Sequence, residues 1–129
     1  MADLKLKTSG YTAQTAYLEL HKVFMVTKLS HYKVKSFAAH EALGKTYDSL
    51  DGLLDSITEK LIGYSGEDPG VLALGSITPA TTVEVGNMIM GIAKRLETFA
   101  EEKGYCDIEN LAQEVSGVGA QLIYLSRFA

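Results

Sequence analysis

The sequence predicts an all-helical protein built as a four-helix bundle. Only two prolines occur among its 129 residues, so few positions interrupt a helix. Long runs without interruption carry apolar residues at helical spacing. Short breaks and one long connection divide these runs into four segments, the element number of a bundle. The length suits a single domain over residues 1–129 with a core of its own.

The composition narrows the functional classes. Apolar residues make up 47% and charged residues 22% of the chain, as in an ordinary soluble domain. A net charge of −4 argues against a nucleic-acid partner and suits a cation binder better. The single cysteine, Cys106, excludes an internal disulfide and fits a reducing compartment. No signal peptide and no apolar run near the roughly 20 residues of a membrane span is visible. We therefore expect a cytoplasmic protein with no membrane partner.

The first half of the chain predicts two antiparallel helices. Residues 1–10 look like a loose N-terminal tail, and apolar spacing predicts a helix from about residue 12 to residue 33. Ser36 can cap a second helix over residues 37–62, which would be about 40 Å long. The break between them is only two or three residues, so these helices should be antiparallel neighbours.

Residues 63–80 form the one long connection, between the second and third helices. They contain both prolines and four glycines. Eighteen extended residues reach about 60 Å, which permits a crossing of the whole bundle but does not require one.

The second half predicts two further helices with clear end signals. Thr81 and Glu84 have the spacing of a capping box, and Gly104 should end the third helix after Lys103. Asp107 can cap the fourth helix. Glycines inside both helices cost helix propensity, so we expect close helix approach at these positions: Gly86, Gly91, Gly117 and Gly119.

The candidate functional residues lie at the end of the first helix and along the second. Measured from His40 on a helical wheel, Asp51, Asp55 and Glu59 fall at about 20°, 60° and 100°. The leucine and isoleucine face of the same helix falls between about −40° and −100°. His40 and the three carboxylates should therefore lie half-buried at the border of the apolar face, where a cation would neutralise them.

Imidazoles and carboxylates together suit iron, manganese or zinc. Asp55 and Glu59, four residues apart, can both point at one ion. His40 lies about 22 Å below Asp55 along the helix axis, so the two cannot share an ion within one chain. A site that combines them needs two antiparallel copies related by a two-fold axis. No nucleophile–base set, HExxH, CxxC or phosphate-binding loop offers another chemistry.

The stretch of sequence over residues 31–61 resembles the ferroxidase signature of the Dps (DNA-protection-during-starvation) mini-ferritins of the ferritin-like superfamily. That signature is a histidine and an aromatic residue, a short bend, Phe and a second histidine, then Asp-x-x-x-Glu fifteen residues later. The chain offers His31-Tyr32, Phe37-Ala38-Ala39-His40 and Asp55-Ser56-Ile57-Thr58-Glu59. The resemblance implies a ferritin-like bundle in which His31 and His40 of one subunit and Asp55 and Glu59 of its mate bind iron. Asp51 is an additional candidate ligand.

The same resemblance implies oxidation of iron(II) by peroxide or dioxygen and a homo-oligomer, from a two-fold dimer up to a hollow dodecamer that stores iron. Two departures keep a second function open. Gly44 stands where that family usually has a carboxylate, and the segment from His31 to His40 is three residues shorter. The alternative is a catalytically silent ferritin-like structural or assembly protein, with the carboxylates forming a solvated helix edge.

Overall fold

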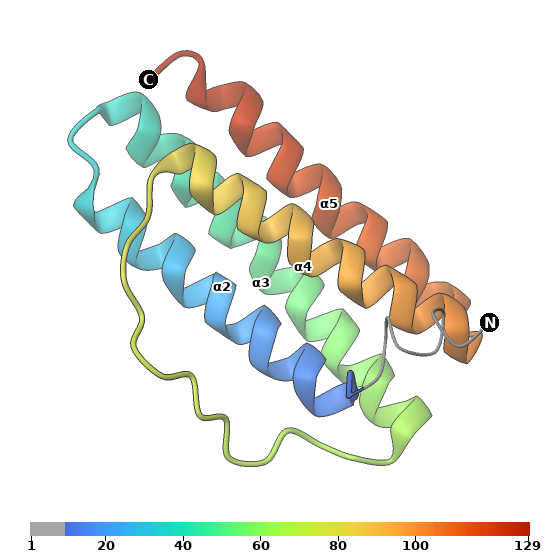
Figure 1. The fold of residues 1–129 in the computed structure, drawn as a ribbon. Helices are drawn as coiled ribbons and strands as arrows, with labels where there is room; N and C mark the ends of the chain where they lie inside the picture. Colours follow the sequence, from blue (N-terminus) through green and yellow to red (C-terminus); the bar gives the residue numbers. More distant parts are fainter. Residues whose placement is uncertain (1–9) are drawn as a thin grey trace.

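The structure, a computed structural model, describes residues 10–129, and this part of the chain contains four helices. They are α2 (Ala13–Lys33), α3 (Phe37–Ser65), α4 (Thr82–Lys103) and α5 (Cys106–Ser126), and this part contains no strand. The helices pack side by side as a bundle (Figure 1). For these residues, the prediction of an all-helical fold with four helices is confirmed. The predicted N-terminal tail lies outside the described residues, apart from Gly10.

The helices form a ring of antiparallel neighbours. α2 packs on α3 and α4, and α5 packs on the same two helices from the other side. The short breaks at residues 34–36 and 104–105 reverse the chain, so each joins an antiparallel pair. α3 and α4 run in the same direction on a diagonal of the bundle (Figure 1). The chain must therefore return the full length of the bundle between them.

Residues 66–81 make this return alongside α2 (Figure 1). Near the start of α2, the Tyr17 hydroxyl donates a hydrogen bond of 2.8 Å to the Glu67 carbonyl. Near its end, the Ala80 N–H donates a bond of 2.9 Å to Ser30 Oγ. Leu72, between these two contacts, is half-buried against the core. The segment is thus held on α2 near both ends and on the apolar core between them.

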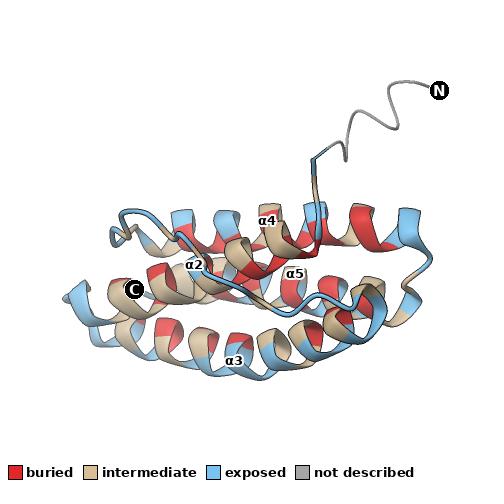
Figure 2. Cartoon of the chain, turned by 90° about the horizontal axis from the view of Figure 1, so that it is seen from below, coloured by how far each residue is buried: buried red, intermediate tan, exposed pale blue. Residues whose placement is uncertain are grey.

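All four helices contribute to one apolar core. Figure 2 shows buried residues on the sides of the helices that face the bundle interior, with exposed residues outside. The largest fully buried side chains include Tyr17, Leu43, Ile57, Leu61, Ile89, Leu96, Ile108 and Leu122. Burial of such side chains stabilises each helix by about 1.5–3 kcal/mol per residue, more than helix propensity supplies.

Most of the helix ends lie where the end signals predict. Ser36 Oγ accepts a hydrogen bond from the Ala39 N–H at the start of α3. Thr81 and Glu84 form the predicted capping box at the start of α4. Gly104 ends α4 with a φ of 76°, a left-handed conformation that glycine adopts without a Cβ clash.

Two helix ends differ from the prediction. α3 continues three residues past Ile62 to Ser65, because the glycine at 63 does not interrupt it and Gly66, with a φ of 74°, ends it instead. The prediction that Asp107 caps the last helix is wrong. α5 begins at Cys106 after Tyr105, which makes no side-chain cap bond, and Asp107 lies within the first turn.

Two of the four helix glycines make the close approach that we expected. A Cβ at Gly119 would lie 2.8 Å from the Gly86 carbonyl oxygen, and a Cβ at Gly86 would lie 3.0 Å from that of Gly119. α4 and α5 therefore pack backbone against backbone at this point. The expectation is wrong for Gly91, which meets only Arg95 of its own helix, and for Gly117, which faces open space.

Candidate functional site

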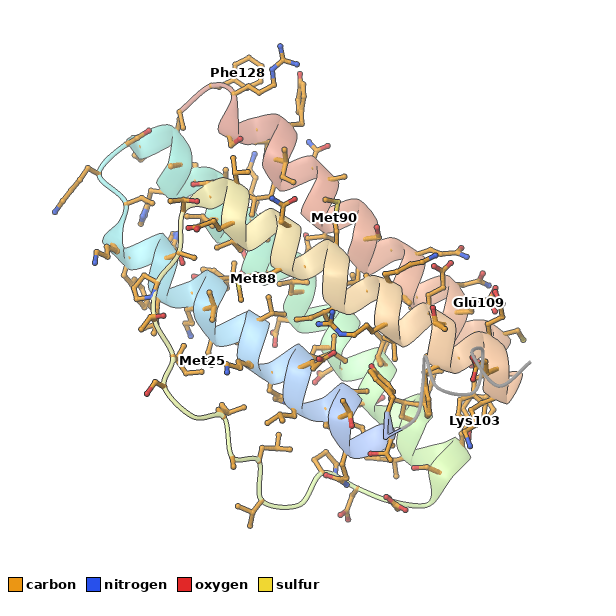
Figure 3. All side chains as sticks on the ribbon, viewed as in Figure 1. Met25, Met88, Met90, Lys103, Glu109 and Phe128 are labelled. Atoms are coloured by element: carbon orange, nitrogen blue, oxygen red, sulfur yellow. The ribbon has the colours of Figure 1, made fainter. Side chains whose placement is uncertain are left out.

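The two candidate histidines come together at the end of the bundle where α2 ends and α3 begins. His31 lies in the last turn of α2 and His40 in the first turn of α3. Their rings stack with centroids 3.8 Å apart and planes 20° from parallel. This is the end at which the chain's C-terminus also lies (Figure 1). Figure 3 shows Phe128 there and Lys103 at the opposite end.

Reciprocal hydrogen bonds fix both imidazoles. His31 Nδ1 lies 2.7 Å from the His40 carbonyl oxygen, and His40 Nδ1 lies 3.0 Å from the His31 carbonyl oxygen. A carbonyl oxygen only accepts, so each Nδ1 is the donor. In the neutral ring the proton on Nδ1 leaves Nε2 with a free lone pair. Metal-binding histidines commonly donate their second ring N–H to a carbonyl in this way.

The surroundings of the pair leave it partly open. Both histidines are half-buried, and the rings of Tyr47 and His31 form a T-shaped pair with centroids 5.2 Å apart. Phe37, 75% exposed, lies beside His40 with ring centroids 6.3 Å apart. Neither imidazole forms a further hydrogen bond within the described residues. Both Nε2 atoms are therefore free of hydrogen bonds to any residue of 10–129.

The three candidate carboxylates lie further along α3, and the prediction that they are half-buried is wrong. Asp51, Asp55 and Glu59 are all exposed. α2 and α5 cover the apolar side of α3 but do not extend over the wheel positions of these carboxylates. None of the three forms an ion pair or hydrogen bond with another described residue, and Lys60 does not neutralise Asp55 or Glu59.

The histidines and the carboxylates are not brought together within one chain. α3 is one helix over Phe37–Ser65, and fifteen residues of helix separate His40 from Asp55 by about 22 Å. Among residues 10–129, no group of three or more histidine, cysteine, aspartate or glutamate side chains could hold a metal ion. The arrangement in one chain is a pair of oriented imidazoles at one place and unpaired carboxylates at another.

The profile of a family of unknown function, DUF5856, matches residues 31–125. The chain belongs to this family. The matched part of the chain includes both candidate histidines, the three candidate carboxylates and all of α3 and α4. No curated protein and no solved structure matches the chain. In the described part of the chain, no helix is both long and apolar enough to cross a membrane.

A second polar contact in this DUF5856 chain lies at the opposite end of the bundle. The Tyr64 hydroxyl, from the last turn of α3, donates to the Asp107 carboxylate in the first turn of α5. This bond raises the pKa of Tyr64 to about 12 and lowers the pKa of Asp107. The Tyr64 ring also stacks on Tyr105 with centroids 4.0 Å apart. The partners are 43 residues apart, so no local sequence signal indicates the contact.

We expect Tyr64→Phe to weaken the folded state only over a defined pH range. The lowered pKa of Asp107 means that its bond stabilises the fold above the carboxyl's unfolded value of 3.8 and fails as pH falls through the folded value. The raised pKa of Tyr64 means that stability is lost above 10.0 as pH rises through about 12. Urea unfolding of both proteins should show the largest difference near pH 7 and converging stabilities at pH 2. An equal difference at pH 2 would contradict the role of Asp107.

Proposed function

We propose that this chain is a Dps-like, ferritin-fold protein that binds iron(II) between two copies of itself and oxidises it. The observation that carries the proposal is the pair of imidazoles, each with its Nδ1 proton on the other's carbonyl and its Nε2 free. Holding both rings in one orientation, with Nε2 available to a metal, costs side-chain entropy. A bound ion would use that orientation, since it requires a neutral nitrogen with a lone pair.

The unpaired carboxylates on α3 would supply the remaining ligands of the site. Asp55 and Glu59 lie one turn apart on α3 and are both exposed, so a second chain can reach them. If two α3 helices lie antiparallel about a two-fold axis near residues 47–50, His40 of one copy comes level with Asp55 or Glu59 of the other. Such an interface has two equivalent sites, as a two-fold dimer requires. Asp51 would lie close to the axis and could add a ligand.

The helix arrangement also supports the resemblance. A return segment between the second and third helices makes α3 and α4 parallel and all the packed neighbours antiparallel. Ferritin-like folds are bundles with one such long crossover, and they bind metals through inward-facing carboxylates and histidines. The chain would contribute position and charge, while the redox chemistry belongs to the iron. Two iron(II) ions, one hydrogen peroxide and two protons would give two iron(III) ions and two waters.

Iron oxidation tests the proposal directly. The metal-free protein is mixed anaerobically with iron(II), peroxide is added, and ferric absorbance is followed. We expect the Asp55→Ala/Glu59→Ala variant to lose oxidation above the rate of iron and peroxide alone, because the carboxylate ligands are gone. Glu101→Ala removes an exposed carboxylate on α4, away from the proposed site, and is the control that should keep the rate. Equal rates for the unsubstituted chain and the double variant would contradict the proposal.

One observation favours the second function, a silent structural or assembly protein. Gly44 supplies no side chain where the resembled family usually has a carboxylate, so the ligand set is smaller. This function predicts no iron binding but retains the homo-oligomer. Light scattering on the metal-free protein separates a dimer from a shell of many subunits, and the iron experiment then separates the two functions.

A further inference from the structure

The His31 ring lies directly over Gly44. A Cβ built at Gly44 would be 3.0 Å from His31 Cε1 and 3.3 Å from His31 Nδ1. Separations this short are rare between a real Cβ and a neighbouring atom, so no side chain fits beneath the ring in its present position. The ring fills the place where the side chain of residue 44 would be.

The backbone does not account for glycine at this position. Gly44 lies inside α3 with ordinary helical geometry, and its φ is not positive. Glycine within a helix lowers helix stability relative to alanine. Gly52 and Gly63 are in the same helix, and a Cβ at either would meet nothing within 4 Å. Among these three, only Gly44 lies against a candidate ligand.

We infer that Gly44 is a positioning residue, whose missing side chain allows His31 to stack on His40 and hold its Nδ1 on the His40 carbonyl. Loss of that bond frees the ring to rotate and to take the other tautomer, with the proton on Nε2. The part of this inference that concerns metal affinity rests on the proposed function; the part that concerns ring position does not.

The geometry also indicates how a substitution would act. In Gly44→Ala the Cβ must push the His31 ring by a few tenths of an ångström, away from a hydrogen bond that is now 2.7 Å long. In Gly44→Val the two added methyl groups exclude the ring from its place. His31 is half-buried at the end of the bundle, so its ring can move towards solvent without disrupting the core. The fold should therefore survive both substitutions.

The test compares Gly44→Ala and Gly44→Val with Gly63→Ala and Gly63→Val, which place the same side chains in open space on the same helix. Histidine side-chain ¹⁵N–¹H spectra of the metal-free proteins report the tautomer of each ring. The unsubstituted chain and both Gly63 variants should show His31 and His40 with the proton on Nδ1. His31 should lose this signature in Gly44→Val and partly lose it in Gly44→Ala.

Anaerobic titration with iron(II) then reports affinity. Loss of a ligand's supporting hydrogen bond typically weakens metal binding by about 10- to 100-fold, so we expect at least a tenfold weaker Kd for Gly44→Val than for Gly63→Val. An unchanged His31 tautomer in Gly44→Val, or equal loss in Gly63→Val, would overturn the inference. If the tautomer changes as expected but the unsubstituted chain binds no iron, the proposed function fails while the positioning role stands.

Discussion

An equimolar mixture of two inactive variants should regain about a quarter of the iron(II) oxidation of the unsubstituted protein. One variant carries His31→Ala/His40→Ala and the other Asp55→Ala/Glu59→Ala. Random pairing makes half of the dimers mixed, and each mixed dimer contains one site with all its ligands and one with none. Only ligands contributed by two different copies give this recovery.

The experiment requires that the two chains are unfolded, mixed and refolded together, so that subunits pair at random. Ferric absorbance after peroxide addition measures the recovered oxidation. Each variant refolded alone is the control and should not exceed the background rate. A mixture that stays at background, although light scattering shows it to be assembled, would contradict a site shared between copies.

The second large effect is expected at the contact between α4 and α5. Gly119→Val should lower the free energy of unfolding by about 2–3 kcal/mol, because its Cβ would lie 2.8 Å from the Gly86 carbonyl oxygen and 2.8 Å from Met90 Cγ. The Gly86 oxygen belongs to a helix backbone, so relief requires α4 and α5 to move apart.

Gly117→Val is the matched control, since it adds the same side chain to the same helix where a Cβ meets nothing within 4 Å. Valine and glycine differ little in helix propensity, so this control should change stability by about 0.5 kcal/mol or less. Urea unfolding at pH 7 measures both variants. Equal losses for the two would mean that the backbone contact between the helices contributes little.

The sequence predicted what depends on neighbouring residues. The caps at Ser36, Thr81 and Gly104 are local signals, and the start of α3 and both ends of α4 lie where expected. The end of α3 was missed because the glycine at 63 tolerates helix, whereas Gly66 ends it with a positive φ. The predicted cap at Asp107 is wrong because α5 begins one residue earlier, at Cys106, and the carboxylate bonds instead to Tyr64, a partner 43 residues away that no local pattern indicates.

Packing decided the remaining differences at the candidate site. The helical wheel placed Asp55 and Glu59 beside the apolar face, but their exposure depends on how far the neighbouring helices extend around α3. The stack of His31 on His40 depends on the turn between the helices, and spacing alone does not reveal it. The helical wheel also restricts which of the two glycines in α5 can contact α4. Gly117 and Gly119 lie about 200° apart on the wheel, so only one could face α4.

The reciprocal bonds between His31 and His40 link ligand binding to folding. The two rings fasten the last turn of α2 to the first turn of α3, so the nitrogens that would bind an ion exist in this arrangement only in the folded chain. By mass action, an ion bound only there would stabilise the fold by about 2.7 kcal/mol at a free concentration of one hundred times its Kd. Ion binding and folding would then be linked in a single equilibrium. The ion-free chain would be the form most susceptible to proteolysis.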